Sequence, residues 1–141
     1  MMVHVTVYHN TDGRFTAFRR EHRLLAAFAF SRALPQDATA EQLAEWTFCL
    51  CNADLKMLVD RHPTIDTAST FLLACRYRLQ RVRSLSVGDV VRISTPAAVY
   101  WLACDGLGWT AITPPPNVAA SQVRKTSTNC GSDRQPTESQ R

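Results

Sequence analysis

The first residues of the chain alternate between valines and more polar side chains, and this alternation constrains the fold more than any other feature. Val3, Val5 and Val7 fall on one face of an extended segment, because successive side chains of a strand point to opposite faces. Their β-branched side chains also favour extended backbone. Residues 2–8 are therefore predicted to form a strand with one face in a core, so the fold must contain a sheet.

Several later segments also carry strand signals. The apolar run of residues 24–30 fits either a buried strand or a buried helix, and the breaker-rich residues 31–35 that follow it favour a strand. From residue 71 to 79, apolar residues alternate with Arg76 and Arg78, which predicts a half-buried strand with a basic outer stripe. A meander is predicted over three segments joined by short turns, namely residues 89–93, 98–104 and 108–112.

Residues 39–51 carry the clearest helix signal. The Thr39 side chain can accept a hydrogen bond from the backbone N–H of Gln42, and the Gln42 side chain can bond back to Thr39, which makes a capping box. Apolar residues then repeat at helical spacing and form a stripe that includes Trp46. This face is expected to pack on a sheet with Trp46 as an anchor. A second, shorter helix is predicted over residues 53–60.

Three consecutive prolines, Pro114–Pro116, mark the end of the predicted domain, because proline has no backbone N–H to donate. The residues that follow are rich in Ser, Thr, Gln, Asn and charge, so residues 114–141 are predicted to be a disordered tail. Residues 1–113 are predicted to form a single α+β domain. It should have a mainly antiparallel sheet with one principal helix packed on one face.

The longest uninterrupted apolar run is only seven residues, 24–30, whereas a membrane-spanning helix needs about 20. No membrane span is therefore expected. The run follows a predicted strand and is short for a secretion signal, so the predicted location is cytoplasmic. The chain has five cysteines, an odd number, which argues against a disulfide framework and for free thiols in a reducing compartment.

Fourteen of the sixteen basic residues are arginines, and the formal net charge is +4. Arginine pairs with phosphate and stacks on bases, so this bias is typical of nucleic-acid binding, although codon usage in a GC-rich genome is the explanation we favour. The charge is unevenly distributed, because residues 14–32 and 76–92 each carry +4 and residues 37–66 carry −4. A protein that holds DNA through phosphates alone usually has a stronger excess on one side.

No arrangement of residues in the sequence dictates a chemical reaction. A Cys–His nucleophile would require Cys75 or Cys104 to meet His9 or His62, and no flanking signature supports such a pair. The cysteines and histidines lack zinc-site spacing, and the five glycines form no phosphate-binding loop. We therefore predict no catalytic residues, no metal ligands and no cofactor.

The strongest candidate contact site is the arginine-rich segment of residues 76–83. Arg76, Arg78, Arg81 and Arg83 are a candidate contact site for nucleic acid or for a protein partner, because their guanidinium groups could follow a phosphate backbone. A charged sheet edge that discourages aggregation would explain the same residues. The sequence leaves both interpretations open.

The next segment, residues 83–91, reads RSLSVGDVV. It is predicted to form a turn in which Gly88 reverses the chain and Asp89 bonds backbone amides. Together with the strand of residues 100–104 and the Gly108-Trp109 turn, it resembles the YodL-like domains found on plasmids and other mobile elements of Gram-positive bacteria. The first strand and the helix that ends near Asn52 fit the same resemblance, which covers most of residues 1–113.

The resemblance implies an accessory role on a mobile element and supplies no active-site residues. The predicted function is that of a non-enzymatic accessory protein of a conjugative plasmid or other mobile element. It would take part in plasmid transfer or spread through contacts with an unknown protein partner. The alternative is a nucleic-acid-binding or anti-defence protein that uses the arginine-rich strand of residues 76–83.

Overall fold

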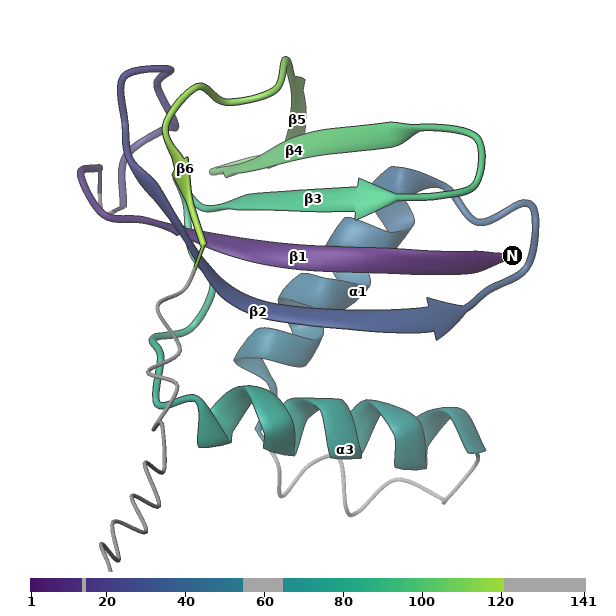
Figure 1. Cartoon of the computed structure of the whole chain (residues 1–141). Helices are drawn as coiled ribbons and strands as arrows, with labels where there is room; N and C mark the ends of the chain where they lie inside the picture. The colour runs from purple at the N-terminus through teal and green to yellow at the C-terminus, as the bar shows by residue number, and fades with distance from the viewer. Residues whose placement is uncertain (14, 55–64, 121–141) are drawn as a thin grey trace, which may run out of the picture.

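The computed structural model describes residues 1–13, 15–54 and 65–120 of the chain. Six strands form one sheet in the order β5-β4-β3-β1-β2-β6, and the sheet curls into a half-barrel (Figure 1). Helix α1 crosses behind the sheet, and helix α3 lies along the β2 side of it. The elements are β1 (Met2–Asn10), β2 (Leu24–Ala33), α1 (Ala40–Asn52), α3 (Ile65–Leu79), β3 (Val90–Ser94), β4 (Val99–Asp105), β5 (Gly108–Ile112) and β6 (Val118–Ala119). The predicted α+β class is confirmed.

Strand β1 lies inside the sheet between β2 and β3, and its valine face is buried in the main core. Val5 pairs with Phe30 of β2 on one side and with Ile93 of β3 on the other. Val3, Val5 and Val7 are at most 1% exposed. Each such side chain stabilises the fold by about 1.5–3 kcal/mol relative to an exposed one. The strands predicted for residues 2–8, 24–30, 89–93, 98–104 and 108–112 are all confirmed to within a few residues.

The sheet has two differently covered faces. One face packs against both helices and forms the main core, to which the helices contribute Leu43, Ala44, Leu50, Cys51, Leu73, Ala74 and Tyr77. The opposite face carries a smaller apolar cluster made of Tyr8, Leu24, Val90 and Ala103, with Phe18, Ala26, Trp101 and Ile112 packed against it. Phe18 comes from the loop between β1 and β2, so this loop covers part of the face that the helices leave open.

Helix α1 confirms the helix predicted for residues 39–51. Thr39 is its N-cap, and both hydrogen bonds of the capping box with Gln42 are present, 3.2 Å to the Thr39 hydroxyl and 3.1 Å from the Thr39 amide. Trp46 is half-buried: its ring packs edge-on against Phe30 at 5.7 Å between centroids, and the Arg32 guanidinium lies 4.2 Å from its centroid. The anchor expected from the sequence thus joins α1 to β2.

The strand predicted for residues 71–79 is wrong, because these residues form the second half of helix α3. Leu73, Ala74 and Tyr77 are buried, a spacing that belongs to one helical face, whereas Leu79 is 79% exposed. The segment between residues 71 and 80 contains no β-branched residue, and Leu, Ala, Arg and Gln all favour helix. The prediction of one principal helix therefore gives way to two helices within the described residues.

The described sheet continues past residue 113, where the sequence analysis ended the domain. Val118 and Ala119 form β6, which pairs in parallel with Leu24 and Leu25 of β2. The Leu24 amide donates to the carbonyl of Asn117 at 2.9 Å.

Residues 121–141, the rest of the predicted tail, lie outside the described residues, and so do residues 55–60 of the shorter predicted helix. The sheet is mainly antiparallel, as predicted, since the β2–β6 pair is the only parallel one among the described strands.

Candidate functional site

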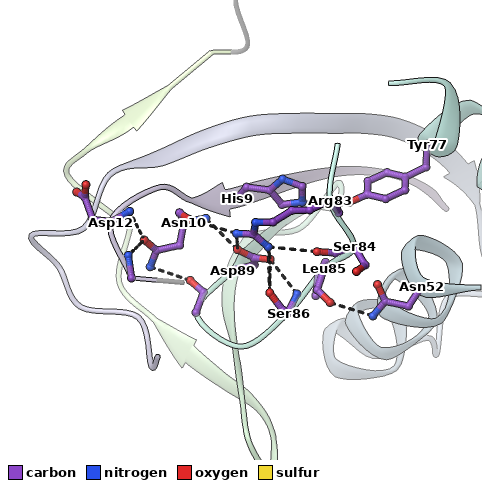
Figure 2. Close-up of polar contacts among 12 residues, drawn as sticks. His9, Asn10, Asp12, Asn52, Tyr77, Arg83, Ser84, Leu85, Ser86 and Asp89 are labelled. Carbon is purple, nitrogen blue, oxygen red and sulfur yellow. Dashed lines mark hydrogen bonds and ion pairs between the residues drawn. The ribbon is translucent and has the colours of Figure 1, made fainter. Parts of the chain in front are cut away.

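The densest group of polar contacts in the described structure surrounds the ion pair between Arg83 and Asp89 (Figure 2). The two guanidinium nitrogens donate to the two carboxylate oxygens of Asp89 at 2.6 Å each, a bidentate geometry. The backbone amides of Asn10 and Ser86 also donate to this carboxylate, at 2.9 and 2.8 Å. Asp89 has no exposed surface, so its charge is fully compensated inside the protein. The predicted bonding of Asp89 to backbone amides is confirmed.

Asn10, at the end of β1, links the ion pair to the neighbouring turn. Its side-chain oxygen accepts from the amides of Asp12 and Gly13 at 3.0 and 2.7 Å, which is the local bonding that asparagine favours in turns. Its side-chain nitrogen donates to the Gly88 carbonyl at 3.1 Å. The turn of residues 10–13 and the turn of residues 83–89 are therefore held against each other by one buried side chain.

Gly88 makes this close approach feasible. Its φ is +93°, in a region that favours glycine, and a Cβ atom built on it would lie 2.3 Å from the Thr16 carbonyl oxygen. Its amide donates to the Cys104 carbonyl at 2.9 Å, which attaches the turn to β4. The chain reversal predicted at Gly88 is confirmed, and the reason is backbone packing as well as backbone conformation.

His9 and Tyr77 extend the cluster toward α3. The Tyr77 hydroxyl donates to the Arg83 carbonyl, so His9 must carry its proton on Nε2 and donate to the tyrosine oxygen at 3.0 Å. His9 is 8% exposed, and burial lowers its pKa below the usual 6.5, partly opposed by the nearby Asp89 charge. Burial raises the pKa of Tyr77. Both rings are therefore neutral near pH 7.

The lowered pKa of His9 predicts a loss of stability in weak acid. The unfolded chain takes up a proton at this residue below about pH 6.5, while the folded chain resists doing so, so the free energy of unfolding falls as the pH drops through that value. The largest slope that one such group can add is about 1.4 kcal/mol per pH unit. Urea unfolding between pH 7.5 and 5.5 should show a shallower decline in His9→Gln, which keeps a donor for Tyr77. An equal decline in both proteins would contradict the assignment.

The cysteines of the cluster are not poised as nucleophiles. Burial raises the pKa of the Cys51 thiol to about 12 and that of Cys104 to about 11, and the Asp89 charge adds to both shifts. The ring hydrogen bond that His9 makes goes to Tyr77. Within the described residues, His9 makes no hydrogen bond to Cys75 or Cys104, the cysteines considered as nucleophiles from the sequence. His62, the other histidine considered, lies outside the described residues.

The four arginines of the predicted contact site are not brought together as one stripe. Arg76, Arg78 and Arg81 are exposed near the end of α3, whereas Arg83 is the ion-pair partner of Asp89. Arg78 donates to the Ala53 carbonyl. Arg76 places its guanidinium carbon 5.6 Å from the centroid of the Phe28 ring.

An open hollow of about 490 Å³ lies over β1 and β2 and reaches Arg76. It is lined by His4, Val5, Thr6, Ala29, Phe30, Ser31 and Arg76, none of which is acidic. His4 and Ser31 are joined across the two strands by a hydrogen bond of 2.5 Å between Nδ1 and Oγ. This hollow is open to solvent, whereas the carboxylate of Asp89 is fully buried.

Within residues 1–13, 15–54 and 65–120, no three His, Cys, Asp or Glu side chains are placed to hold a metal ion. Neither α1 nor α3 combines the length and the apolar character that crossing a membrane requires. The carboxylate of Glu45, on α1, accepts a hydrogen bond from the Trp109 indole at 3.1 Å and so serves the contact between α1 and β5.

Sequence reasoning missed the pairing of Arg83 with Asp89. The spacing of six residues around a Gly-containing turn was the available signal, because such a turn brings its two ends together. The role of Asn10 had no comparable signal, since it lies 79 residues from Asp89 in the chain. Comparison with protein-family models, curated proteins and solved structures finds no match for this chain. The resemblance to YodL-like domains therefore stays a prediction.

Proposed function

We propose that this chain is a non-enzymatic accessory protein that acts in the cytoplasm through contacts with other proteins. The observation that carries this proposal is the state of the Arg83–Asp89 cluster. Both carboxylate oxygens of Asp89 already accept at least two hydrogen bonds, and no part of Asp89 is exposed. A group in that state stabilises the fold and has no free lone pair directed at a substrate.

The role in plasmid transfer or spread rests on the resemblance of residues 83–91 and 100–109 to domains of mobile elements. The gene neighbourhood tests that part of the proposal. Adjacent transfer genes would support conjugation, whereas a position in a phage early operon would support the anti-defence alternative. Neither outcome bears on the proposal that the protein is not an enzyme, which depends on the Arg83–Asp89 cluster.

The proposal that no thiol acts as a catalyst gives a direct prediction. Cys51 and Cys104, with their pKa values raised to about 12 and about 11, should react with iodoacetamide far more slowly than a free thiol between pH 7 and 9. Peptide mass spectrometry after timed alkylation measures each cysteine separately. The exposed Cys49 is the internal comparison, since it lies on the same helix as Cys51. Rapid labelling of Cys104 at pH 7 would contradict the proposal.

Exposed apolar side chains make protein contacts a reasonable mode of action. Leu72 on α3 is 63% exposed, and Leu107 at the tip of the β4–β5 hairpin is fully exposed. A photo-crosslinking amino acid placed at Leu72, Leu107 or Ala29 in the producing cell should give a cross-linked protein of constant mass from at least one position. No cross-link from any of the three positions would contradict the proposal.

Nucleic-acid binding is the second candidate, favoured by the three exposed arginines near the end of α3. Fluorescence anisotropy with labelled DNA at two salt concentrations tests it, because binding through phosphates weakens steeply as salt rises. Salt-sensitive binding that disappears in Arg76→Ala/Arg78→Ala would support this alternative. Binding that is absent, or that the double variant retains, would leave protein contacts as the function.

A further inference from the structure

Among the described residues, most of the outer edge of strand β2 has no strand partner. Its inner edge pairs with β1 over the whole strand, but on its outer edge β6 pairs only with Leu24 and Leu25. Beyond Leu25, that outer edge has no strand partner among the described residues. An unpaired edge of this kind is a template for adding another strand.

The register shows which backbone groups face outward. The Leu34 amide donates to the Met1 carbonyl, and the Met1 amino group donates to the Leu34 carbonyl, so these two residues form a hydrogen-bonded pair with β1. Such pairs alternate along an antiparallel ladder. The backbone N–H and C=O groups of Phe30 and Arg32 therefore bond to β1. Those of the residues that alternate with Phe30 and Arg32 point away from β1. These outward residues are Ala29, Ser31 and Ala33.

The outward positions lack the usual devices that keep strands apart. Ala29, Ser31 and Ala33 are small and exposed, so they leave room for a neighbouring backbone. Residues 26–33 contain no proline and no lysine, and the one irregularity in the β1–β2 register lies nearer the other end, between Val7 and Tyr8. The three outward positions in this half of β2 are therefore exposed and carry none of these devices.

The chemistry beside this edge is basic. Ala29, Phe30 and Ser31 line the open hollow together with Arg76, whose guanidinium is held close to the Phe28 ring. No lining residue is acidic. A strand that lay along Ala29–Ala33 would thus place a side chain near an exposed cation, and a carboxylate there would be favoured over a cationic side chain.

We infer that the outer edge of β2, from Ala29 to Ala33, binds an extended segment of a partner protein as an additional strand, and that Arg76 selects segments with an acidic residue at the hollow. The inference rests on the proposed function, because it names the surface and the kind of partner. Main-chain hydrogen bonds to Ala29, Ser31 and Ala33 supply the affinity, and Arg76 supplies the specificity.

The test is selection of a random ten-residue peptide library, displayed on phage, against the full-length protein. The selected peptides should be enriched in Asp and Glu and should shift the NMR signals of the backbone amides of Ala29, Ser31 and Ala33. Arg76→Glu should lower the affinity for the acidic peptides at least about tenfold, the effect of roughly 1.4 kcal/mol. Arg81→Glu is the matched control, since it makes the same charge change at an exposed position that does not line the hollow.

A second variant tests the backbone contacts. Ala29→Pro removes an N–H that points away from β1, so the β1–β2 ladder keeps its hydrogen bonds while the added strand loses one. The affinity of Ala29→Pro for the selected peptides should fall about tenfold or more. Its far-UV circular dichroism spectrum should stay unchanged. Equal affinity in Ala29→Pro, or peptides that shift only amides outside β2, would overturn the inference.

Other occupants of the edge give different results, and each would overturn the assignment. A concentration-dependent dimer that Ala29→Pro abolishes in sedimentation would identify a second copy of the chain. Displacement of the peptide by single-stranded DNA would identify nucleic acid. Slow hydrogen exchange of the Ser31 amide without peptide would mean that the edge is already paired. Cross-links from Leu72 or Leu107 alone, without any from Ala29, would keep the proposed function and remove only this inference.

Discussion

Replacing Arg83 by methionine should lower the free energy of unfolding by about 3–5 kcal/mol, the usual cost of removing one partner from a buried ion pair. The carboxylate of Asp89 would stay fully buried and would lose both guanidinium bonds of 2.6 Å. Methionine fills a volume close to that of the aliphatic part of arginine, so the loss reports mainly on the charge. Urea unfolding at pH 7 measures the difference.

Arg81→Met is the control, because Arg81 is exposed two residues earlier and its loss should change stability by no more than about 0.5 kcal/mol. The double variant Arg83→Met/Asp89→Asn removes the uncompensated charge and keeps an acceptor for one of the two backbone amides, because Asn10 and Ser86 donate to different oxygens of Asp89. It should be more stable than Arg83→Met alone. If Arg83→Met lowered the free energy of unfolding by less than 1 kcal/mol, Arg83 would be a surface residue, as the sequence analysis expected. The assignment of a buried ion pair between Arg83 and Asp89 would then be wrong.

Gly88→Ala should cost about 3–4 kcal/mol, for two reasons that add. Alanine disfavours the φ of +93°, and its Cβ would lie 2.3 Å from the Thr16 carbonyl oxygen and 2.8 Å from that of Gly13. Because both atoms belong to the backbone, relief requires the loop between β1 and β2 to move. The melting temperature and the urea midpoint should both fall, and the turn should become accessible to proteolysis.

Two other glycines separate these reasons. Gly108 has a φ of +141° with no atom within 4 Å of a built Cβ, so Gly108→Ala measures the conformational cost without the collision. Gly106 has neither feature, and Gly106→Ala should be nearly neutral. If Gly88→Ala cost no more than Gly108→Ala, the close approach of the two turns at Gly88 would not be present in solution.

The parts of the fold with local signals were predictable. The valine alternation located β1, and the capping box of Thr39 and Gln42 located the start of α1, because each signal depends on residues within one turn or one strand. The same period-two reasoning failed at residues 71–79. There the apolar alternation was accidental, and the absence of β-branched residues was the better guide to a helix.

The candidate site depended more on distant contacts, and the sequence showed less of it. The bonding of Asp89 within its turn was correctly predicted, since its partner Ser86 is close in the chain. Its bond to Asn10, and the strand pairing of β6 with Leu24, join segments separated by 79 residues or more. No local pattern specifies such a pairing, so the open edge of β2 was visible only in the structure.

The position of β1 between β2 and β3 has a consequence for synthesis on the ribosome. The β1–β2 hairpin is complete after 33 residues, but β3 begins only at Val90, after both described helices. Until β3 emerges, the second edge of β1 has no strand partner, although both described helices, which pack on its valine face, have already been synthesised. Nascent chains of this kind are candidates for chaperone binding, and the joining of β3 to β1 is expected to be a slow step of folding, because the two strands are separated by residues 11–89.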